Sequence, residues 1–165
     1  GKLSLNEEAV DLAALVQSVN QQLYTRAAAG SVRLTGIVPP TVPYLLADAR
    51  LIKQTLLNLV SNAVKFTLPG GEVAVSVEER PEGIALVVKD TGIGMKPSDI
   101  PKAMERFSQI DNSLSRRHEG TGLGLYLVKL FAALHQAKVS LASEPDVGTT
   151  ATVLFPPTRR VARQA

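Results

Sequence analysis

The order of helical and strand-like segments is the feature that most limits how this chain can fold. Apolar residues at helical spacing predict helices over about 10–28, 48–66 and 123–134, with a shorter one over 97–106. Asp48 is a candidate N-cap for the second of them. Alternating apolar residues predict strands over 32–38, 44–47, 72–79, 83–89, 138–142 and 149–155. Helices and strands do not alternate strictly, which argues against a doubly wound parallel sheet. We therefore expect a two-layer α/β sandwich, a mixed and mostly antiparallel sheet with helices on one face.

The size and composition of the chain favour one globular domain. Its 165 residues are 45% hydrophobic and 20% charged, which is enough to bury a core. We expect the domain over 1–157 and a frayed basic tail over 158–165, which carries Arg159, Arg160 and Arg163. Cysteine is absent, so disulfides and thiolate metal sites are excluded.

The charge pattern bears on the kind of partner. The net charge is +3, aromatic residues make up 4% and tryptophan is absent. Nucleic-acid binders usually carry a basic stripe with interleaved aromatics, so we expect no nucleic-acid partner. A weak basic excess suits an anionic small molecule such as a nucleotide. The most apolar stretch, residues 123–134, is too short to span a membrane and contains Lys129, so we expect no direct membrane contact.

A polar stripe on the second predicted helix is the first candidate site. It comprises Gln54, Asn58, Ser61, Asn62 and Lys65. Amide oxygens are hard ligands that suit Mg²⁺ bound to phosphates, and a lysine can meet a phosphate as a point charge. The helix alone fits a solvated polar face at least as well.

Two glycine-rich loops are the other candidates. Asp90 follows an apolar strand and precedes Gly92 and Gly94, so its carboxylate could accept a hydrogen bond from an exocyclic amine while the glycines approach a flat ring. An ordinary Asp-led turn is the alternative. Residues 120–125 open the third helix, where free N–H groups and the helix dipole favour an anion. Their spacing matches neither the dinucleotide fingerprint nor a P-loop.

Other chemistries are disfavoured. The histidines, His118 and His135, fall in a loop and at a helix end, which argues against a metal hydrolase. No Gly-x-Ser-x-Gly nucleophile elbow is present. Arg116 and Arg117, just before the second glycine-rich loop, also fit solvated loop charge.

Taken together, the motifs resemble the catalytic and ATP-binding domain of two-component sensor histidine kinases, in the GHKL superfamily shared with gyrase, Hsp90 and MutL. The resemblance covers about residues 3–156. Its motifs are an N box at 58–66, a first G box at 90–95, an F box at 105–109, a second G box at 120–125, and the Gly148-Thr149 pair.

The resemblance implies a Bergerat-type fold that binds ATP and Mg²⁺. Asp90 would take the adenine amine, and Asn62, with Asn58 nearby, would hold Mg²⁺. Residues 108–120 would form an ATP lid. The implied nucleotide-binding residues are Asn58, Asn62, Lys65, Phe66, Asp90, Gly92, Gly94, Gly120, Thr121, Gly122, Leu123, Gly124, Leu125 and Thr149. The implied catalytic residues are Asn58, Lys65, Arg116 and Arg117.

The resemblance also implies an activity: transfer of the ATP γ-phosphoryl group to a histidine on a separate helical dimerisation domain of the same receptor. The receiver domain of a response regulator would be an indirect partner. Asn58 stands where superfamily ATPases carry a general-base glutamate, which favours transfer over hydrolysis. Met104 in the F box and His135-Gln136-Ala137 after the third helix also depart from the family pattern.

No helical hairpin precedes Leu3, so the chain resembles the ATP-binding half of a larger receptor. We expect a cytoplasmic, monomeric domain. Two alternatives stay open: a nucleotide-gated interaction module without kinase activity, and an anti-sigma-type serine kinase of the same superfamily.

Overall fold

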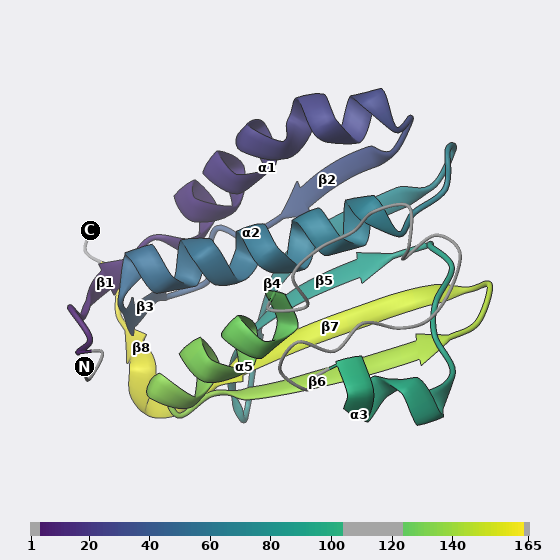
Figure 1. Cartoon of the computed structure of the whole chain (residues 1–165). Coiled ribbons are helices and arrows are strands. Elements are labelled where there is room, and N and C mark those ends of the chain that lie inside the picture. Colours follow the sequence, from purple (N-terminus) through teal and green to yellow (C-terminus); the bar gives the residue numbers. More distant parts are fainter. Residues whose placement is uncertain (1–3, 104–123, 164–165) are drawn as a thin grey trace.

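A computed structural model describes residues 4–103 and 124–163 of the chain. In this part of the chain a five-stranded sheet has the order β2-β4-β5-β7-β6 (Figure 1). Its strands are β2 (Arg33–Ile37), β4 (Glu72–Arg80), β5 (Gly83–Asp90), β6 (Lys138–Glu144) and β7 (Gly148–Phe155). The pair of β2 and β4 is parallel, and the other described pairs are antiparallel.

Helices form the second layer. They are α1 (Leu12–Ala29), α2 (Ala49–Lys65), α3 (Ile100–Ala103) and α5 (Gly124–Leu134), with single 3₁₀ turns at Pro97–Asp99 and Pro157–Arg159. The helices α1, α2 and α5 lie on one face of the large sheet (Figure 1). This arrangement confirms the expected two-layer α/β sandwich. Among the described residues, no helix has the length and apolar content needed to cross a lipid bilayer.

A small second sheet stands at one end of the molecule. It joins β1 (Glu8–Val10), β3 (Tyr44–Ala47) and β8 (Arg160–Val161) in the order β1-β3-β8. Both of its pairs are antiparallel. The first and the last strand of the described chain thus belong to the same sheet (Figure 1). The predicted strand over 44–47 is confirmed, whereas the sequence pattern did not reveal β1 or β8.

Aspartate caps fix where the first two helices begin. The Asp11 Oδ1 atom accepts hydrogen bonds from the N–H groups of Ala13 and Ala14 at 3.0 and 3.3 Å. Asp48 does the same for Arg50 at 3.1 Å, which confirms its predicted role as a cap. Such caps satisfy N–H groups that have no partner within the helix. They therefore stabilise the first turn of each helix.

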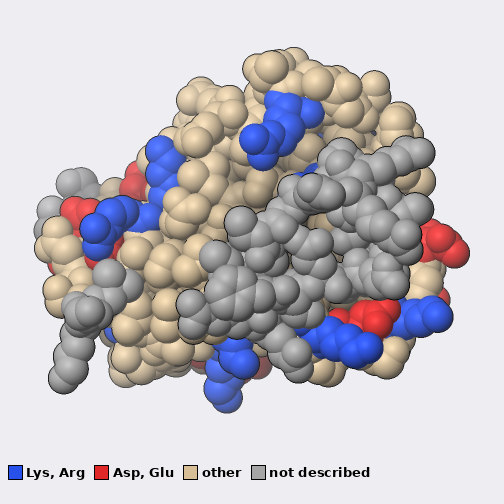
Figure 2. Space-filling view, viewed as in Figure 1, with Lys and Arg blue, Asp and Glu red and all other residues tan. Residues whose placement is uncertain are grey.

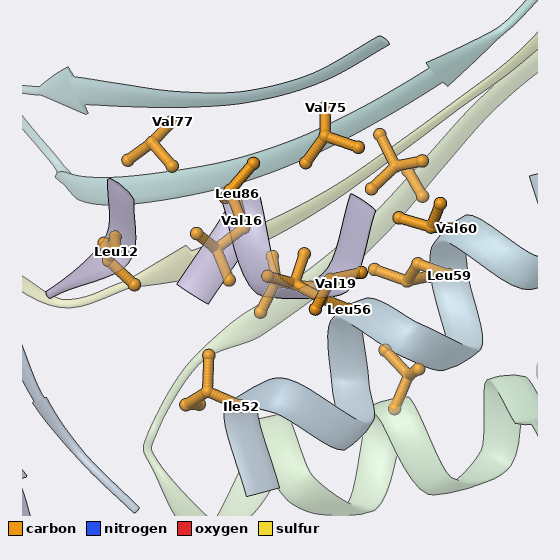
Figure 3. Close-up of a cluster of buried hydrophobic side chains, with 14 of the residues drawn as sticks. Leu12, Val16, Val19, Ile52, Leu56, Leu59, Val60, Val75, Val77 and Leu86 are labelled. Carbon is orange, nitrogen blue, oxygen red and sulfur yellow. The ribbon is translucent and has the colours of Figure 1, made fainter. Parts of the chain in front are cut away.

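The core lies between the helices and the sheet. Figure 3 shows apolar side chains of α1 and α2 pointing toward β4 and β5. Val19, Leu56 and Val60 from the helices and Val73 and Leu86 from the strands are all fully buried. Because one face of α2 packs here, its polar stripe is turned toward α5. Packing of the core thus orients the candidate site.

The expectation of a frayed tail over 158–165 is wrong for its described part. Arg159 is 7% exposed, and Arg160 and Val161 pair with β3 as strand β8. The physical reason is that carbonyl and carboxylate groups accept the hydrogen bonds of the buried guanidinium and so offset the cost of burying it. The composition of the segment after Pro156-Pro157 does not reveal these partners. Residues 164–165 lie outside the described part.

His135 follows α5 and is fully buried. Its Nε2 accepts a hydrogen bond from the Asp48 N–H at 3.1 Å, so Nδ1 carries the proton and donates to the Phe131 carbonyl at 2.7 Å. Burial lowers the pKa of this imidazole, and the nearby Arg159 charge lowers it further. The neighbouring Gln136 adopts a left-handed φ of 56° in the turn between α5 and β6.

This histidine makes stability depend on pH. The unfolded imidazole takes up a proton near pH 6.5, while the folded one stays neutral to lower pH, so the unfolded state binds more protons in that window. We expect the free energy of unfolding to fall as pH drops from about 7.5 to about 5.5. Urea unfolding of His135→Gln should lack this part of the decrease. Identical pH dependence in both proteins would contradict the assignment.

Candidate functional site

The polar stripe of α2 lies against the first turn of α5. The Asn58 Nδ2 atom donates to the Gly124 carbonyl at 3.5 Å, and its Oδ1 accepts from Gln54 Nε2 at 3.0 Å. A Cβ atom at Gly124 would lie 3.4 Å from the Asn62 amide nitrogen. Asn58, Asn62 and Lys65 are half-buried, whereas Gln54 is exposed. The stripe is therefore a surface shared by two helices, which disfavours the solvated-face alternative for its inner residues.

The two asparagines differ in their hydrogen bonds. Both ends of the Asn58 amide are engaged, by Gln54 and by Gly124. Within the described part of the chain, the Asn62 side chain makes no hydrogen bond. An amide oxygen without a partner is the one that can coordinate a hard cation. The geometry therefore favours Asn62 over Asn58 as a metal ligand.

Asp90 ends β5 with its carboxylate almost buried, at 9% exposure for the residue. Its Oδ1 accepts hydrogen bonds from the Gly92 N–H at 2.9 Å and the Thr149 N–H at 3.2 Å. Within the described residues, both hydrogen bonds to this carboxylate end on Oδ1, which leaves Oδ2 as an acceptor for a ligand. Burial raises the pKa of Asp90, and the two N–H donors oppose that change. The Gly92 and Thr149 N–H groups thus fix the orientation of the carboxylate.

The glycines of this loop make close approaches to the protein itself. A Cβ atom at Gly92 would lie 2.3 Å from the Phe66 carbonyl oxygen, which also accepts a hydrogen bond from the Ile93 N–H at 3.1 Å. Gly94 has a φ of +65°, and its Cβ would lie 2.0 Å from the Glu144 carbonyl oxygen. These contacts fasten the Asp90 loop to the end of α2 and to the β6–β7 turn. Approach to a flat ring stays a prediction.

Sequence reasoning missed Ser143 on β6. Its Oγ accepts a hydrogen bond from the Met95 N–H at 2.8 Å, contacts the Thr149 Oγ1 at 2.7 Å and donates to the Gly148 carbonyl at 3.0 Å. Ser143 pairs with Thr149 across the strands. No local signal could identify it, because its role depends on strand register. It supports the β7 residue that holds Asp90.

Substitution of Gly94 should test whether its close approach to the Glu144 carbonyl requires glycine. Alanine with left-handed φ costs about 1–2 kcal/mol, and the clash with the Glu144 carbonyl adds about 1–3 kcal/mol. We expect Gly94→Ala to lower the free energy of unfolding by at least about 2 kcal/mol, measured by urea unfolding. The matched control is Gly70→Ala, because Gly70 has a φ of +89° with nothing within 4 Å of a Cβ. Equal losses in the two variants would contradict the packing argument.

Several predicted residues lie outside the described part of the chain. They are Met104, the F box at 105–109, the lid at 108–120, Arg116, Arg117, His118, Gly120, Thr121, Gly122 and Leu123. Leu125 is described, and its side chain packs against the hydrophobic core. Lys65 and Phe66 at the end of α2 are half-buried. The described site is therefore an acceptor at Asp90, an amide stripe on α2, and the beginning of α5.

Charge is spread unevenly over the molecule. On the face drawn in Figure 2, lysine and arginine side chains stand in separate small groups, several of them beside aspartate or glutamate.

Within residues 4–103 and 124–163, no group of three His, Asp or Glu residues is placed to hold a metal ion. The described site offers amide oxygens and one lysine instead.

A buried carboxylate that can accept from a base, with an amide and lysine stripe nearby, is an arrangement that fits a nucleotide. The sequence profile of the family described as histidine kinase-, DNA gyrase B-, and HSP90-like ATPase matches residues 47–159. The chain belongs to this family. It is an ATP-binding catalytic domain of the sensor histidine kinase type.

Individual relatives agree with this assignment. The cell-division control histidine kinase PdhS of Brucella abortus (strain S19) is 39% identical over 172 residues, covering 98% of this chain. The chain spans only 16% of that relative's length. Full-length ShkA in complex with AMPPNP is 28% identical with a TM-score of 0.86, covering 99% of this chain and 33% of ShkA. The mycobacterial sensor histidine kinase MprB is 26% identical with a TM-score of 0.76, covering 91% of this chain and 97% of the MprB chain.

Proposed function

We propose that the chain transfers the γ-phosphoryl group of ATP to a histidine on a helical dimerisation domain of the same receptor. A ring nitrogen of that histidine forms a bond to the γ-phosphorus as the bond to the bridging oxygen breaks. ADP leaves, and the ring releases its proton to solvent. The receiver domain of a response regulator then takes the phosphoryl group from the histidine.

One observation carries this proposal: an amide, not a carboxylate, occupies position 58 where the stripe of α2 meets α5. Asn58 donates to the Gly124 carbonyl through its amide nitrogen, which a carboxylate cannot do. No proton acceptor therefore stands at this position to activate water. Support for transfer to histidine comes from the relatives, which are named histidine kinases.

The described residues fit a phosphate-bound Mg²⁺. We propose that Asn62 is its protein ligand through Oδ1, because that amide makes no hydrogen bond in the described part of the chain. When bound, Mg²⁺ would neutralise charge on the phosphates. Lys65, half-buried one turn further along α2, meets the phosphates as a point charge. Asp90 orients the base through Oδ2.

The remaining roles are proposed from the resemblance. The lid at 108–120 closes over ATP, Arg116 and Arg117 reach the terminal phosphate, and Gly120, Thr121, Gly122 and Leu123 bind phosphates before α5. The domain is cytoplasmic and monomeric when isolated. The test is transfer of label from ATP to the helical domain: label on its histidine supports the proposal, whereas ATP binding without transfer would indicate an interaction module.

A further inference from the structure

Arg159 joins segments that are far apart in the sequence. Its guanidinium donates to the Glu7 carboxylate at 2.7 Å, to the Leu46 carbonyl at 2.8 Å and to the Gln136 side chain at 2.7 Å. A fourth hydrogen bond reaches the His135 carbonyl at 2.6 Å. The Arg159 side chain is 8% exposed. One nearly buried cation therefore ties the first segment of the chain to β3 and to the turn after α5.

The other arginines of the C-terminal segment extend this attachment. Arg163 lies 3.8 Å from the Asp11 carboxylate that caps α1, and it stacks over the Tyr44 ring at 5.1 Å. Arg160 lies 3.5 Å from the Glu79 carboxylate and also bonds the Arg80 carbonyl. We call residues 159–163 the arginine clasp. Two of its three arginines bind carboxylates in the first 11 residues of the chain.

The segment held by the clasp is also attached to the helix that carries the amide stripe. The Asn6 N–H donates to the Asp48 carboxylate at 3.1 Å, and Asp48 caps α2. The Asp48 N–H in turn donates to His135 at the end of α5. Residues 6–7 are therefore fixed to the ends of both α2 and α5. The other ends of these two helices carry Asn62 and Gly124, so the helices are rigid connections between the clasp and the nucleotide site.

We propose that Arg159 is a positioning residue for phosphoryl transfer. By holding Glu7, it fixes the direction of the segment that leads into the domain, relative to the ends of α2 and α5. It thereby orients the nucleotide site toward a phosphoacceptor domain attached through that segment. Arg159 comes directly before β8, a strand of the small sheet (Figure 1), and its side chain bonds β3 and the turn after α5, at the ends of α2 and α5 opposite to Asn62 and Gly124. Its effect is therefore on orientation and not on ATP contacts. This inference rests on the proposed function.

The test compares a phosphoacceptor domain attached to this chain, as in the full-length receptor, with the same domain added separately. The variants are Glu7→Ala and Arg159→Lys, because lysine keeps the charge but cannot reach four acceptors. At saturating ATP, we expect the rate of histidine labelling in the attached form to fall roughly 10- to 100-fold. The ATP dissociation constant and the labelling rate of the separately added domain should change less than about twofold.

Two controls separate positioning from stability. Glu8→Gln changes an exposed neighbouring carboxylate and should label at the parent rate. Glu7→Gln keeps an acceptor oxygen and should lose less rate than Glu7→Ala. If Arg159→Lys does not fold, Glu7→Ala carries the test, because Glu7 is an exposed residue.

Three outcomes would overturn the inference. The first is an unchanged attached-form rate in Glu7→Ala. The second is an equal loss in the attached and separate forms, which would mean that the clasp acts only on stability. The third is the absence of labelling by the unchanged receptor, which would overturn the proposed function and this inference with it. Labelling by the receptor with unchanged variant rates would overturn the inference alone.

Discussion

Replacing Asp90 with alanine is expected to weaken ATP binding roughly 10- to 100-fold, while the fold survives. The carboxylate is nearly buried, and its Oδ1 is already held by the Gly92 and Thr149 N–H groups. Oδ2 is therefore the atom that can accept from the adenine amine. A charge-assisted hydrogen bond of this kind is worth about 1.5–3 kcal/mol. Calorimetric titration with ATP measures the loss directly.

Two comparisons make this test specific for the base. Inosine triphosphate lacks the exocyclic amine, so the parent chain should prefer ATP over it and Asp90→Ala should not. Asp90→Asn can keep an oxygen toward Gly92 and Thr149, but it then presents an amide N–H to the adenine amine. Its ATP affinity should fall while its urea unfolding stays near that of the parent. ATP binding by Asp90→Ala at the parent affinity would show that the assignment of Asp90 is wrong.

Replacing Asn62 with alanine is expected to abolish the dependence of ATP affinity on Mg²⁺. Asn62 presents the amide without a hydrogen bond in the described stripe, and it lies beside the start of α5. Loss of a metal ligand should weaken binding about 10- to 100-fold when Mg²⁺ is present and little when it is chelated. Lys65→Ala should also weaken binding, because the phosphates lose a cation. The measurement is calorimetry with and without Mg²⁺.

The control lies on the same helix face. Ser61 donates a hydrogen bond to the Asn58 carbonyl of its own helix at 3.3 Å, so Ser61→Ala should keep the parent's dependence on Mg²⁺. Asp90→Ala should also keep that dependence, because it removes a base contact and not a phosphate contact. Equal dependence on Mg²⁺ in Asn62→Ala, Lys65→Ala and Asp90→Ala would contradict the separation of base recognition from phosphate recognition.

Local patterns predicted most of the regular elements. The alternation of apolar residues identified both large hairpins, and Asp48 identified the beginning of α2, because period and capping are properties of short segments. The strand β8 escaped prediction because its partner, β3, lies more than a hundred residues earlier in the chain. The same distance explains the error over the tail. The partners of Arg159 belong to segments that only the fold brings together.

The candidate site was predictable as a set of motifs but not as a geometry. Their spacing of four residues predicted that Asn58 and Asn62 share one helix face, and the preceding apolar run predicted that Asp90 lies at the end of a strand. The sequence did not reveal that Thr149 holds Asp90 or that Asn58 is engaged while Asn62 is not. Gly92 and Gly94 were interpreted through a ligand, whereas their described contacts are with Phe66 and Glu144. Register and packing decide these points, and neither is a local property.

We propose that this chain holds ATP for transfer to a histidine on a separate domain. The direct measurement is incubation with γ-labelled ATP, alone and with the helical histidine domain of its receptor. Alone, the chain should bind ATP, keep it largely intact and stay unlabelled, because Asn58 provides no base for water and the buried ring of His135 is fully engaged.

With the helical domain present, label should appear on that partner in an acid-labile, base-stable form. It should be absent when the acceptor histidine is replaced, and it should fall when Arg116 and Arg117 are both changed to alanine. Strong labelling of the chain alone, or no labelling of an intact partner, would contradict the account of a histidine kinase catalytic domain that acts on a separate phosphoacceptor.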